Sequence, residues 1–549
     1  MPLVSGVSYK CAACKTIIFP KKTERLNEFK TSGDKKKIFM MSWLEDLELK
    51  QMIERRANRI YILLISIYLG FGIFWFFFGY MNNDEGWYLY ASRLVYDGKL
   101  PYIDFSYTQS PLLPYIYGIP QLLFGPSLYM GRLTSLFFGL LTCVFTAKLA
   151  EKLVGKMGAV IALALLCSSL TTIYYFTIVK TYALTSFLII FSLYLSFGSN
   201  RRNPLKIMLP IFVMCLAVGV RLSVLPALLL LMLYLVYTER KNIGAVVLGI
   251  STGLVTCGIL FVPLLLMNKD VSIFNLIGNH VASLEYRGLG AILRQKASTV
   301  VELVRVYFTI VALVVVGLIL HFYGCSKSST GNTKYYLLLF LIVLSVCAVQ
   351  LIPTPTYVEY GVILVPVVSI LAAFGFNKIY THSIENPIRN TLLLIMTLVI
   401  LIPTILTGFK DVRLGLGEEE KPISQIEEMG YYIKSHTPAD GNLLAFSTYV
   451  AIAADRKVLP GFEMSIFSYY ADWSTDKARE YHVINRDLLN EYIESKSAAA
   501  IMLTPFEIEW CQIGNDTLGL IEENYYLAKS MPNFGQWSDT AYLYLPQTK

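Results

Sequence analysis

Residues 82–111 read NNDEGWYLYASRLVYDGKLPYIDFSYTQSP, and this polar, carboxylate-bearing stretch directly follows the apolar run Ile60–Tyr80. A run of that length can cross a bilayer, because about 20 apolar residues in a helix span the hydrocarbon core. Asp84 and Glu85 are therefore expected at the level of the lipid headgroups.

The segment Glu85–Tyr96 has the spacing of an amphipathic helix. Gly98 marks its expected end, and its apolar face carries Trp87, Tyr90, Ala91, Leu94 and Val95. This pattern predicts a helix that lies on the membrane surface, with Asp84 near its N-terminus.

The composition is that of a multi-span membrane protein. The chain has 549 residues, of which 55% are hydrophobic and only 16% charged, with a mean hydropathy of +0.53. Residues 1–59 are rich in lysine and arginine, which predicts a cytoplasmic tail followed by a signal anchor. Because basic inner loops explain much of the net charge of +8, no nucleic-acid partner is expected.

Apolar runs and basic breaks alternate through residues 60–408. Hydropathy and charge bias together predict about eleven transmembrane helices in this region, with a first outer loop at 81–110. Met157–Phe197 is expected to hold two helices, and Ile207–Tyr237 two short helices with a turn at Arg221. The further expected spans are Ile243–Leu266, Thr299–Phe322, Tyr335–Ile352, Glu359–Phe376 and Thr391–Gly408.

Residues 409–549 have the composition of a soluble α/β domain. An odd number of spans places this domain on the extracytoplasmic side. The expected helices are Ser424–Lys434 and Asp487–Ser495, and the expected strands are Asn442–Phe446, Ala498–Leu503, Tyr525–Lys529 and Ala541–Leu545.

The expected outer surface carries carboxylates that could act as a base and cations that suit a lipid phosphate. Asp84 and Glu85, with Asp104 brought close by a folded-back helix, could supply a general base and a partner that tunes it. The candidate phosphate-binding cations are Lys180, Arg221, Arg287, Arg294 and Lys296.

Each of these residues also has a simpler interpretation. Asp84 could cap a helix, and Asp104 could be a turn residue. Lys180 and Arg221 could extend to the outer interface, although ionisable residues in apolar spans are functional candidates. The three other cations could form a solvated loop face, and we expect His280 to form loop hydrogen bonds rather than bind a metal.

Three short motifs together resemble the GT-C superfamily of polyprenyl-phosphate-sugar glycosyltransferases. The resemblance is strongest to the protein O-mannosyltransferases and aminoarabinose transferases. The motifs are Asn83–Tyr88, with an acidic pair after the first span, Pro101–Phe105, and Gln109–Leu112 before the next apolar run. A late loop, Tyr357–Tyr360, is also similar, with Glu359 in place of the family's arginine.

The resemblance implies a membrane enzyme with Asp84 as catalytic base and Glu85 beside it. Some relatives have a Glu-Lys pair before the motif's proline, where this chain has Gln109-Ser110, so Asp104 is the expected substitute carboxylate. Tyr88, Gln109, Tyr357 and Glu359 are the expected substrate-binding residues.

The implied reaction is inverting displacement from a polyprenyl-phosphate sugar onto a protein, lipid or glycan hydroxyl. No cofactor is predicted, although a role for a divalent metal stays open. The expected location is an archaeal or bacterial plasma membrane. An oligosaccharyl or polymer-type transferase is the alternative enzyme, and a membrane transporter is the alternative from another class.

Overall fold

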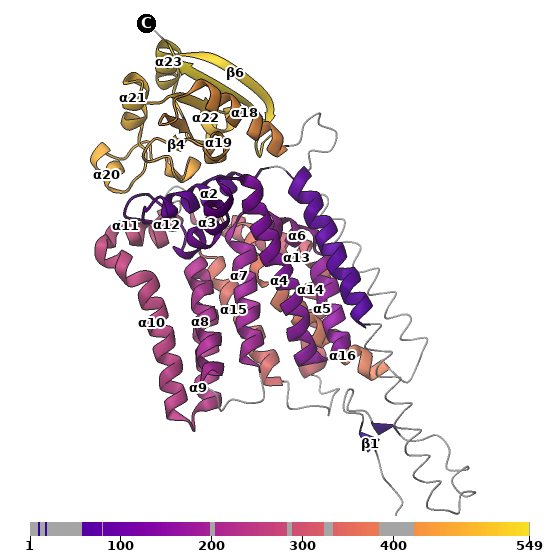
Figure 1. Ribbon diagram of the computed structural model, residues 1–549. Coiled ribbons are helices and arrows are strands. Elements are labelled where there is room, and N and C mark those ends of the chain that lie inside the picture. Colours follow the sequence, from indigo (N-terminus) through magenta and orange to yellow (C-terminus); the bar gives the residue numbers. More distant parts are fainter. Residues whose placement is uncertain are drawn as a thin grey trace, which may run out of the picture.

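The computed structural model describes residues 9–10, 17–18, 57–79, 81–197, 204–282, 288–322, 333–383, 422–537 and 539–547. Figure 1 shows a bundle of helices with a smaller α/β domain across one end. Helices α2 and α3 lie between the two parts (Figure 1). The expected basic tail and the expected span 391–408 fall almost entirely outside these residues.

Five helices in the described part of the chain are long and apolar enough to cross a membrane, or up to seven if each of two bent pairs counts as one span. The five are Ala57–Phe78, α4 (Leu128–Val154), η1 with α9 (Leu222–Val224 and Leu225–Glu239), α10 (Ile243–Met267) and η3 with the start of α16 (Val358–Leu364 and Val365–Ser383). The bent pairs are α5 with α6 (Lys156–Ser168 and Leu170–Thr177) and α13 with α14 (Leu289–Val306 and Phe308–Phe322). The shorter apolar helices are α3 (Leu112–Phe124), α7 (Thr181–Ser196), α8 (Leu205–Val220) and α15 (Thr333–Gln350).

The prediction of about eleven spans is therefore not confirmed for the part of the chain described. The turn at Arg221 is confirmed, because α8 ends there and α9 begins at Leu225. The single span expected at Thr299–Phe322 is wrong, because α13 and α14 meet at an angle of 88°. Helix α13 carries charged residues such as Lys296 and Arg305, which a helix crossing the hydrocarbon could bury only at high cost.

Small residues allow close helix packing inside the bundle. A side chain at Gly317 of α14 would approach the Cα atom of Gly375 of α16 to 2.7 Å, so these two helices meet through bare backbone. Packing of this kind holds membrane helices together where burial from water contributes little. A hydrogen bond also links α7 and α8, because the Ser192 hydroxyl donates to the Pro210 carbonyl.

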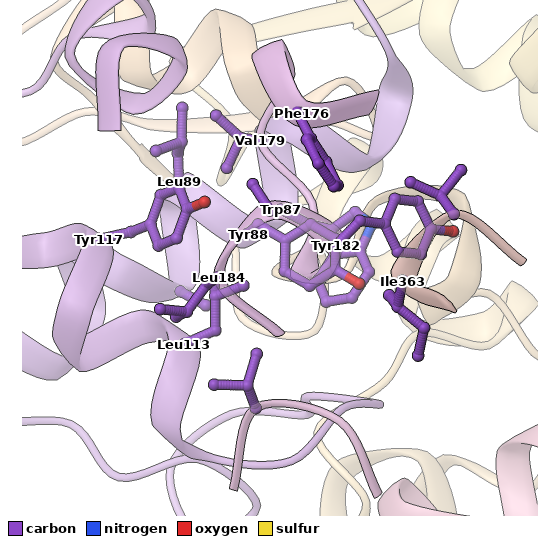
Figure 2. Close-up of a cluster of buried hydrophobic side chains, with 14 of the residues drawn as sticks. Trp87, Tyr88, Leu89, Leu113, Tyr117, Phe176, Val179, Tyr182, Leu184 and Ile363 are labelled. Carbon is purple, nitrogen blue, oxygen red and sulfur yellow. The ribbon is translucent and has the colours of Figure 1, made fainter. Parts of the chain in front are cut away.

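Helix α2 (Asn83–Tyr96) matches the expected helix but is buried more completely than a surface helix would be. One side faces a cluster of buried side chains from α2, α3, α7 and η3, drawn in Figure 2 and including Trp87, Tyr88, Tyr117, Tyr182 and Ile363. The other side is covered by the C-terminal domain, whose helix α19 (Thr448–Ala454) packs on it. Both apolar and polar positions of α2 are therefore enclosed.

The C-terminal domain holds a five-stranded sheet in the order β4-β3-β5-β7-β6. Strands β4, β3 and β5 run parallel, whereas β7 is antiparallel to both β5 and β6. The strands are β3 (Asn442–Ala445), β4 (Lys457–Val458), β5 (Ala500–Leu503), β6 (Tyr525–Phe534) and β7 (Asp539–Pro546). The helices are α18 (Pro422–His436), α19, η4 (Ser465–Ser468), α20 (Thr475–Glu480), α21 (Arg486–Glu494), α22 (Pro505–Trp510) and α23 (Asn515–Asn524). The two helices and four strands predicted for this region are all confirmed, as α18, α21, β3, β5, β6 and β7.

Polar contacts hold this domain on α2. The Val458 amide donates to the Tyr90 hydroxyl at 3.0 Å, and Arg93 pairs with Asp455 at 3.0 Å. Gly86 permits the close approach of α19, because a side chain at Gly86 would come within 2.6 Å of the Tyr449 amide nitrogen. The start of α2, where Asp84 lies, is thus fixed against both parts of the molecule.

Candidate functional site

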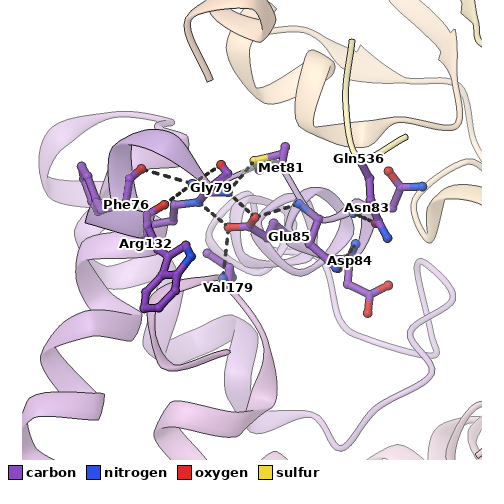
Figure 3. Close-up of polar contacts among 11 residues, drawn as sticks. Phe76, Gly79, Met81, Asn83, Asp84, Glu85, Arg132, Val179 and Gln536 are labelled. Atoms are coloured by element: carbon purple, nitrogen blue, oxygen red, sulfur yellow. Dashed lines mark hydrogen bonds and ion pairs between the residues drawn. The ribbon is translucent and has the colours of Figure 1, made fainter. Parts of the chain in front are cut away.

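Glu85 is enclosed in a network that anchors the start of α2. Its side chain is 0% exposed, and Arg132 of α4 donates to both carboxylate oxygens, at 2.7 and 2.9 Å. The backbone amides of Asn82 and Val179 also donate to Glu85. Arg132 in turn donates to the carbonyls of Trp75, Phe76 and Gly79 at the end of the first helix (Figure 3).

This network differs from the catalytic role expected for Glu85. Four donated hydrogen bonds occupy its carboxylate, and no face of it reaches solvent. The geometry therefore makes Glu85 an anchor that ties α2 to α4 and to the first helix, because a buried charge persists only when it is paired and hydrogen-bonded.

Asp84 lies on the same turn but faces another direction. Figure 3 shows its carboxylate pointing away from the Glu85–Arg132 network. The helix is capped by Asn82, whose side chain accepts a hydrogen bond from the Asp84 amide. The capping role considered for Asp84 therefore belongs to Asn82. The Asp84 side chain is 25% exposed and accepts a hydrogen bond from the Trp87 indole at 3.2 Å.

Lys180 joins Asp84 to a second carboxylate. This lysine directly precedes α7, its side chain is only 5% exposed, and its Nζ atom lies 2.9 Å from Asp84 Oδ2. The same Nζ atom lies 3.5 Å from Oε1 of Glu359 at the start of η3. Asp84 of α2 and Glu359 of η3 therefore both contact the ammonium group of Lys180, which lies between α6 and α7, and all three were predicted site residues.

Arg221 is held beside this group by aromatic rings. Its guanidinium carbon lies 5.2 Å from the Tyr182 ring centre and 4.9 Å from that of Tyr360, and Nη1 donates to Thr181 Oγ1 at 2.9 Å. The Tyr182 ring is also 5.7 Å from Lys180 Nζ, so the two cations share one aromatic neighbour. Within the described residues, the buried Nε atom of Arg221 has no hydrogen-bond partner.

Tyr88 lies close enough to interact electrostatically with Asp84, Arg221 and Lys180. Burial raises the pKa of Tyr88, so its phenol stays neutral and keeps a proton to donate. The sequence placed this tyrosine among the substrate-binding residues, and the structure brings it to the group of charges.

The other predicted residues of the first loop and the late loop make contacts of their own. Asp104 accepts from the Leu100 amide at 2.7 Å and lies 3.8 Å from Lys99, so it stabilises the turn as in its simpler interpretation. The Gln109 backbone carbonyl accepts from the Tyr102 hydroxyl, and Tyr357 is 40% exposed beside the ring of Tyr360. His280 contacts the Thr108 carbonyl at 2.9 Å, as expected for a hydrogen-bonding residue.

Of the five predicted phosphate-binding cations, two belong to the site. Lys296 instead donates to the carbonyls of Leu351, Ile352 and Pro353, which satisfies its ammonium and clamps the loop after α15. Arg294 lies exposed on α13, and Arg287 falls outside the described residues. Lys180 and Arg221 are brought together because each lies at a break between apolar helices at the same end of the bundle.

The sequence reasoning missed Arg132, Tyr182 and Tyr360. Arg132 carried a signal, because an arginine inside the apolar helix Leu128–Val154 requires a partner. Tyr360 belongs to the late-loop motif but was not singled out, and Tyr182 carried no signal, because aromatic residues abound in this chain and only the fold shows which of them face a cation.

The candidate site thus has equal numbers of negative and positive side chains, at the end of the bundle that carries the C-terminal domain. Asp84 and Glu359 provide two negative charges, and Lys180 and Arg221 provide two positive charges. Among the described residues, no group of three or more histidine, cysteine, aspartate or glutamate side chains could hold a metal ion. The arrangement can accept a proton at Asp84 and bind an anion at Arg221.

Comparison with known proteins gave matches only to solved structures. No protein-family model and no curated protein sequence matches the chain. The fold is similar to that of ArnT from Cupriavidus metallidurans bound to undecaprenyl phosphate, with a TM-score of 0.57 and 13% identity over 88% of this chain and 97% of that one. It is also similar to the Archaeoglobus fulgidus oligosaccharyltransferase, with a TM-score of 0.53 and 12% identity over 90% of this chain and 74% of that one.

This chain has the GT-C fold. The fold expected from the motifs of residues 83–112 is therefore confirmed, as a polytopic helical membrane protein with a C-terminal α/β domain. In this fold, Asp84 lies at the start of the helix that follows the first span, beneath the C-terminal domain.

Proposed function

We propose that this chain is an integral membrane glycosyltransferase that moves a sugar from a polyprenyl-phosphate donor to an acceptor hydroxyl. The observation that carries this proposal is the meeting of Asp84, Lys180, Arg221 and Glu359, from four separate segments, at one end of an apolar bundle. A base and two cations at a membrane boundary suit a donor whose lipid stays in the bilayer while its phosphate and sugar reach water.

Asp84 is the proposed general base. Each of its carboxylate oxygens accepts one interaction, from Trp87 or Lys180, and has a further lone pair to accept a proton. The acceptor oxygen forms a bond to the anomeric carbon and passes its proton to Asp84. The bond between that carbon and the phosphate oxygen breaks, its electron pair leaves with the lipid phosphate, and the configuration of the sugar inverts.

Arg221 is the proposed main contact of the donor phosphate. The leaving phosphate gains negative charge, and cations already in position lower the barrier because they need no reorganisation. A planar guanidinium can donate two parallel hydrogen bonds to a phosphate, and Arg221 has a buried N–H group that is unpaired in the described structure. Tyr182 and Tyr360 hold its plane in place.

The likeness to ArnT supports a lipid-phosphate donor, because that protein was solved with undecaprenyl phosphate bound. The Archaeoglobus fulgidus oligosaccharyltransferase was solved with an acceptor peptide, which supports a peptide or protein acceptor as one option. We further propose that the domain-bearing end of the bundle is extracytoplasmic, as the charge bias of the loops predicts.

Binding of undecaprenyl phosphate to the chain in nanodiscs tests the donor assignment. Arg221→Ala should weaken binding by about tenfold or more, because a charge-assisted bidentate contact contributes on the order of 1.5–3 kcal/mol. Arg294→Ala removes an exposed arginine from α13 and is the matched control, with wild-type affinity expected. Equal losses in both variants, or none in either, would contradict the assignment.

A further inference from the structure

Lys180 occupies the place between two carboxylates where a transferase could hold a metal ion. Its Nζ atom lies 2.9 Å from Asp84 Oδ2 and 3.5 Å from Glu359 Oε1, and its side chain is 5% exposed. Two carboxylates from different segments facing one buried cation is the arrangement in which enzymes hold Mg²⁺ or Mn²⁺ near a phosphate.

We propose that the Lys180 ammonium is a built-in cation that takes the place of a divalent metal ion between Asp84 and Glu359. Lys180 is then a positioning residue, which orients the Asp84 carboxylate and supplies fixed positive charge near the donor phosphate. The catalytic part of this proposal rests on the proposed glycosyl transfer, whereas its ion-binding part does not.

The distances suit an ammonium better than a metal ion. Oxygen ligands lie about 2.0–2.1 Å from Mg²⁺ and about 2.3–2.6 Å from Ca²⁺, whereas charge-assisted N–H···O contacts are about 2.7–2.9 Å long. The Asp84 contact has the ammonium length, and the Glu359 contact is longer still. A metal ion at this point would require both carboxylates to move inward.

The net positive charge of Lys180 and Arg221 also agrees with a role in place of a divalent metal ion. Lys180 and Arg221 share contact with the Tyr182 ring and together carry two positive charges, the same as one divalent ion. Glu359 gives Lys180 a second carboxylate, so the ammonium stays next to Asp84 when Asp84 takes up a proton during transfer.

Removing the ammonium should turn this place into a metal site. Lys180→Ala removes the ammonium between Asp84 and Glu359 and leaves Arg221 in place. Mn²⁺ binding to the full chain in nanodiscs can be followed by electron paramagnetic resonance. Lys180→Ala should bind Mn²⁺ about tenfold more tightly than wild type, because oxygen-ligand charge sets affinity for such ions. The double variant Lys180→Ala with Glu359→Gln should lose that gain.

Turnover gives a second measurement. Wild-type transfer should stay within about twofold in excess EDTA, whereas Lys180→Ala should lose about a hundredfold, as removal of one preorganised charge does. Mn²⁺ should restore the variant about tenfold, and a merely structural lysine would show no such rescue. Lys180→Ser serves the same test if thermal unfolding shows that the alanine variant does not fold.

Two results would overturn the proposal. One is wild-type transfer that stops in EDTA and returns with Mn²⁺, and the other is a folded Lys180 variant that binds Mn²⁺ no better than wild type. Absence of any transfer by the wild-type chain would instead overturn the proposed function, and the Mn²⁺ comparison would still decide whether Lys180 occupies a cation site.

Discussion

At the scale of single residues, two adjacent carboxylates have different roles because they point in different directions. Glu85 points into the bundle, where Arg132 and two backbone amides bind it completely. Asp84 points towards Lys180 and is partly exposed. The helix turn between them separates a structural ion pair from the proposed catalytic base, so substitutions at the two positions should affect different properties.

Glu85→Gln should destabilise the protein. The change leaves the buried Arg132 guanidinium without its counter-charge, and loss of one partner of a buried pair costs about 3–5 kcal/mol. Thermal unfolding in detergent, followed by tryptophan fluorescence, should show a clearly lower midpoint than for wild type. A Glu85→Gln protein that unfolds like wild type and yet transfers no sugar would instead place Glu85 in the chemistry.

At the scale of elements, the position of α2 depends on contacts with both the helical bundle and the C-terminal domain. Its inner side packs on α3 and α4, and its outer side packs on α19 of the C-terminal domain. Buried side chains of α7 and η3, such as Tyr182 and Ile363, gather beside Trp87 and Tyr88 of α2 (Figure 2). The contact with α19 passes over Gly86, where the helices come close enough to exclude a Cβ atom. The position of Asp84 therefore depends on the docking of a domain that begins more than three hundred residues later in the chain.

Gly86→Ala should disturb this docking. The added methyl group would lie 2.6 Å from the Tyr449 amide nitrogen, and overpacking of this kind costs about 1–3 kcal/mol. We expect a lower thermal midpoint and faster proteolysis of the C-terminal domain. Gly519→Ala is the control, since a methyl group there, on helix α23, meets open space and should leave the midpoint unchanged or slightly higher. Equal behaviour of the two variants would refute a close contact at Gly86.

At the scale of the whole molecule, the C-terminal domain combines a small α/β core with two acids of raised pKa, the buried Glu507 and the half-buried Glu463. Burial raises the pKa of Glu463 and of Glu507 to about 7. Both carboxyl groups lie in loops or caps of this domain, and Glu507 accepts from the Ser447 hydroxyl and the Thr504 amide. The acids therefore link the stability of the domain to pH.

The stability of the domain should fall as pH rises. A carboxyl group whose pKa is higher in the folded state than in the unfolded state binds its proton more tightly when folded, so the free energy of unfolding decreases between about pH 4.5 and about pH 7. The double variant Glu463→Gln with Glu507→Gln should have a flatter dependence of its thermal midpoint over that window. A wild-type midpoint that increases with pH there would contradict the prediction.

The fold was more predictable than the site for physical reasons. Hydropathy and periodicity depend on neighbours in sequence, and they located α2, the break at Arg221 and the strands of the C-terminal domain. Site geometry depends on contacts between distant parts of the chain, which the sequence does not show. The sequence therefore grouped Asp104 and Lys296 with Asp84, whereas backbone groups bind both of them, the Leu100 amide at Asp104 and the carbonyls after α15 at Lys296. The motif residues Asp84 and Glu359 and the cations Lys180 and Arg221 did come together.

The most direct test of the central claim is sugar transfer from polyprenyl-phosphate donors by Asp84→Asn and Asp104→Asn, each purified in nanodiscs. Asp84→Asn should lose transfer by at least about a hundredfold, as removal of a general base does, and should unfold near the wild-type temperature. Asp104→Asn, which removes a carboxylate from a turn in the same loop, should keep most of its activity. Transfer retained in Asp84→Asn, or lost equally in both, would contradict the claim that Asp84 accepts the proton.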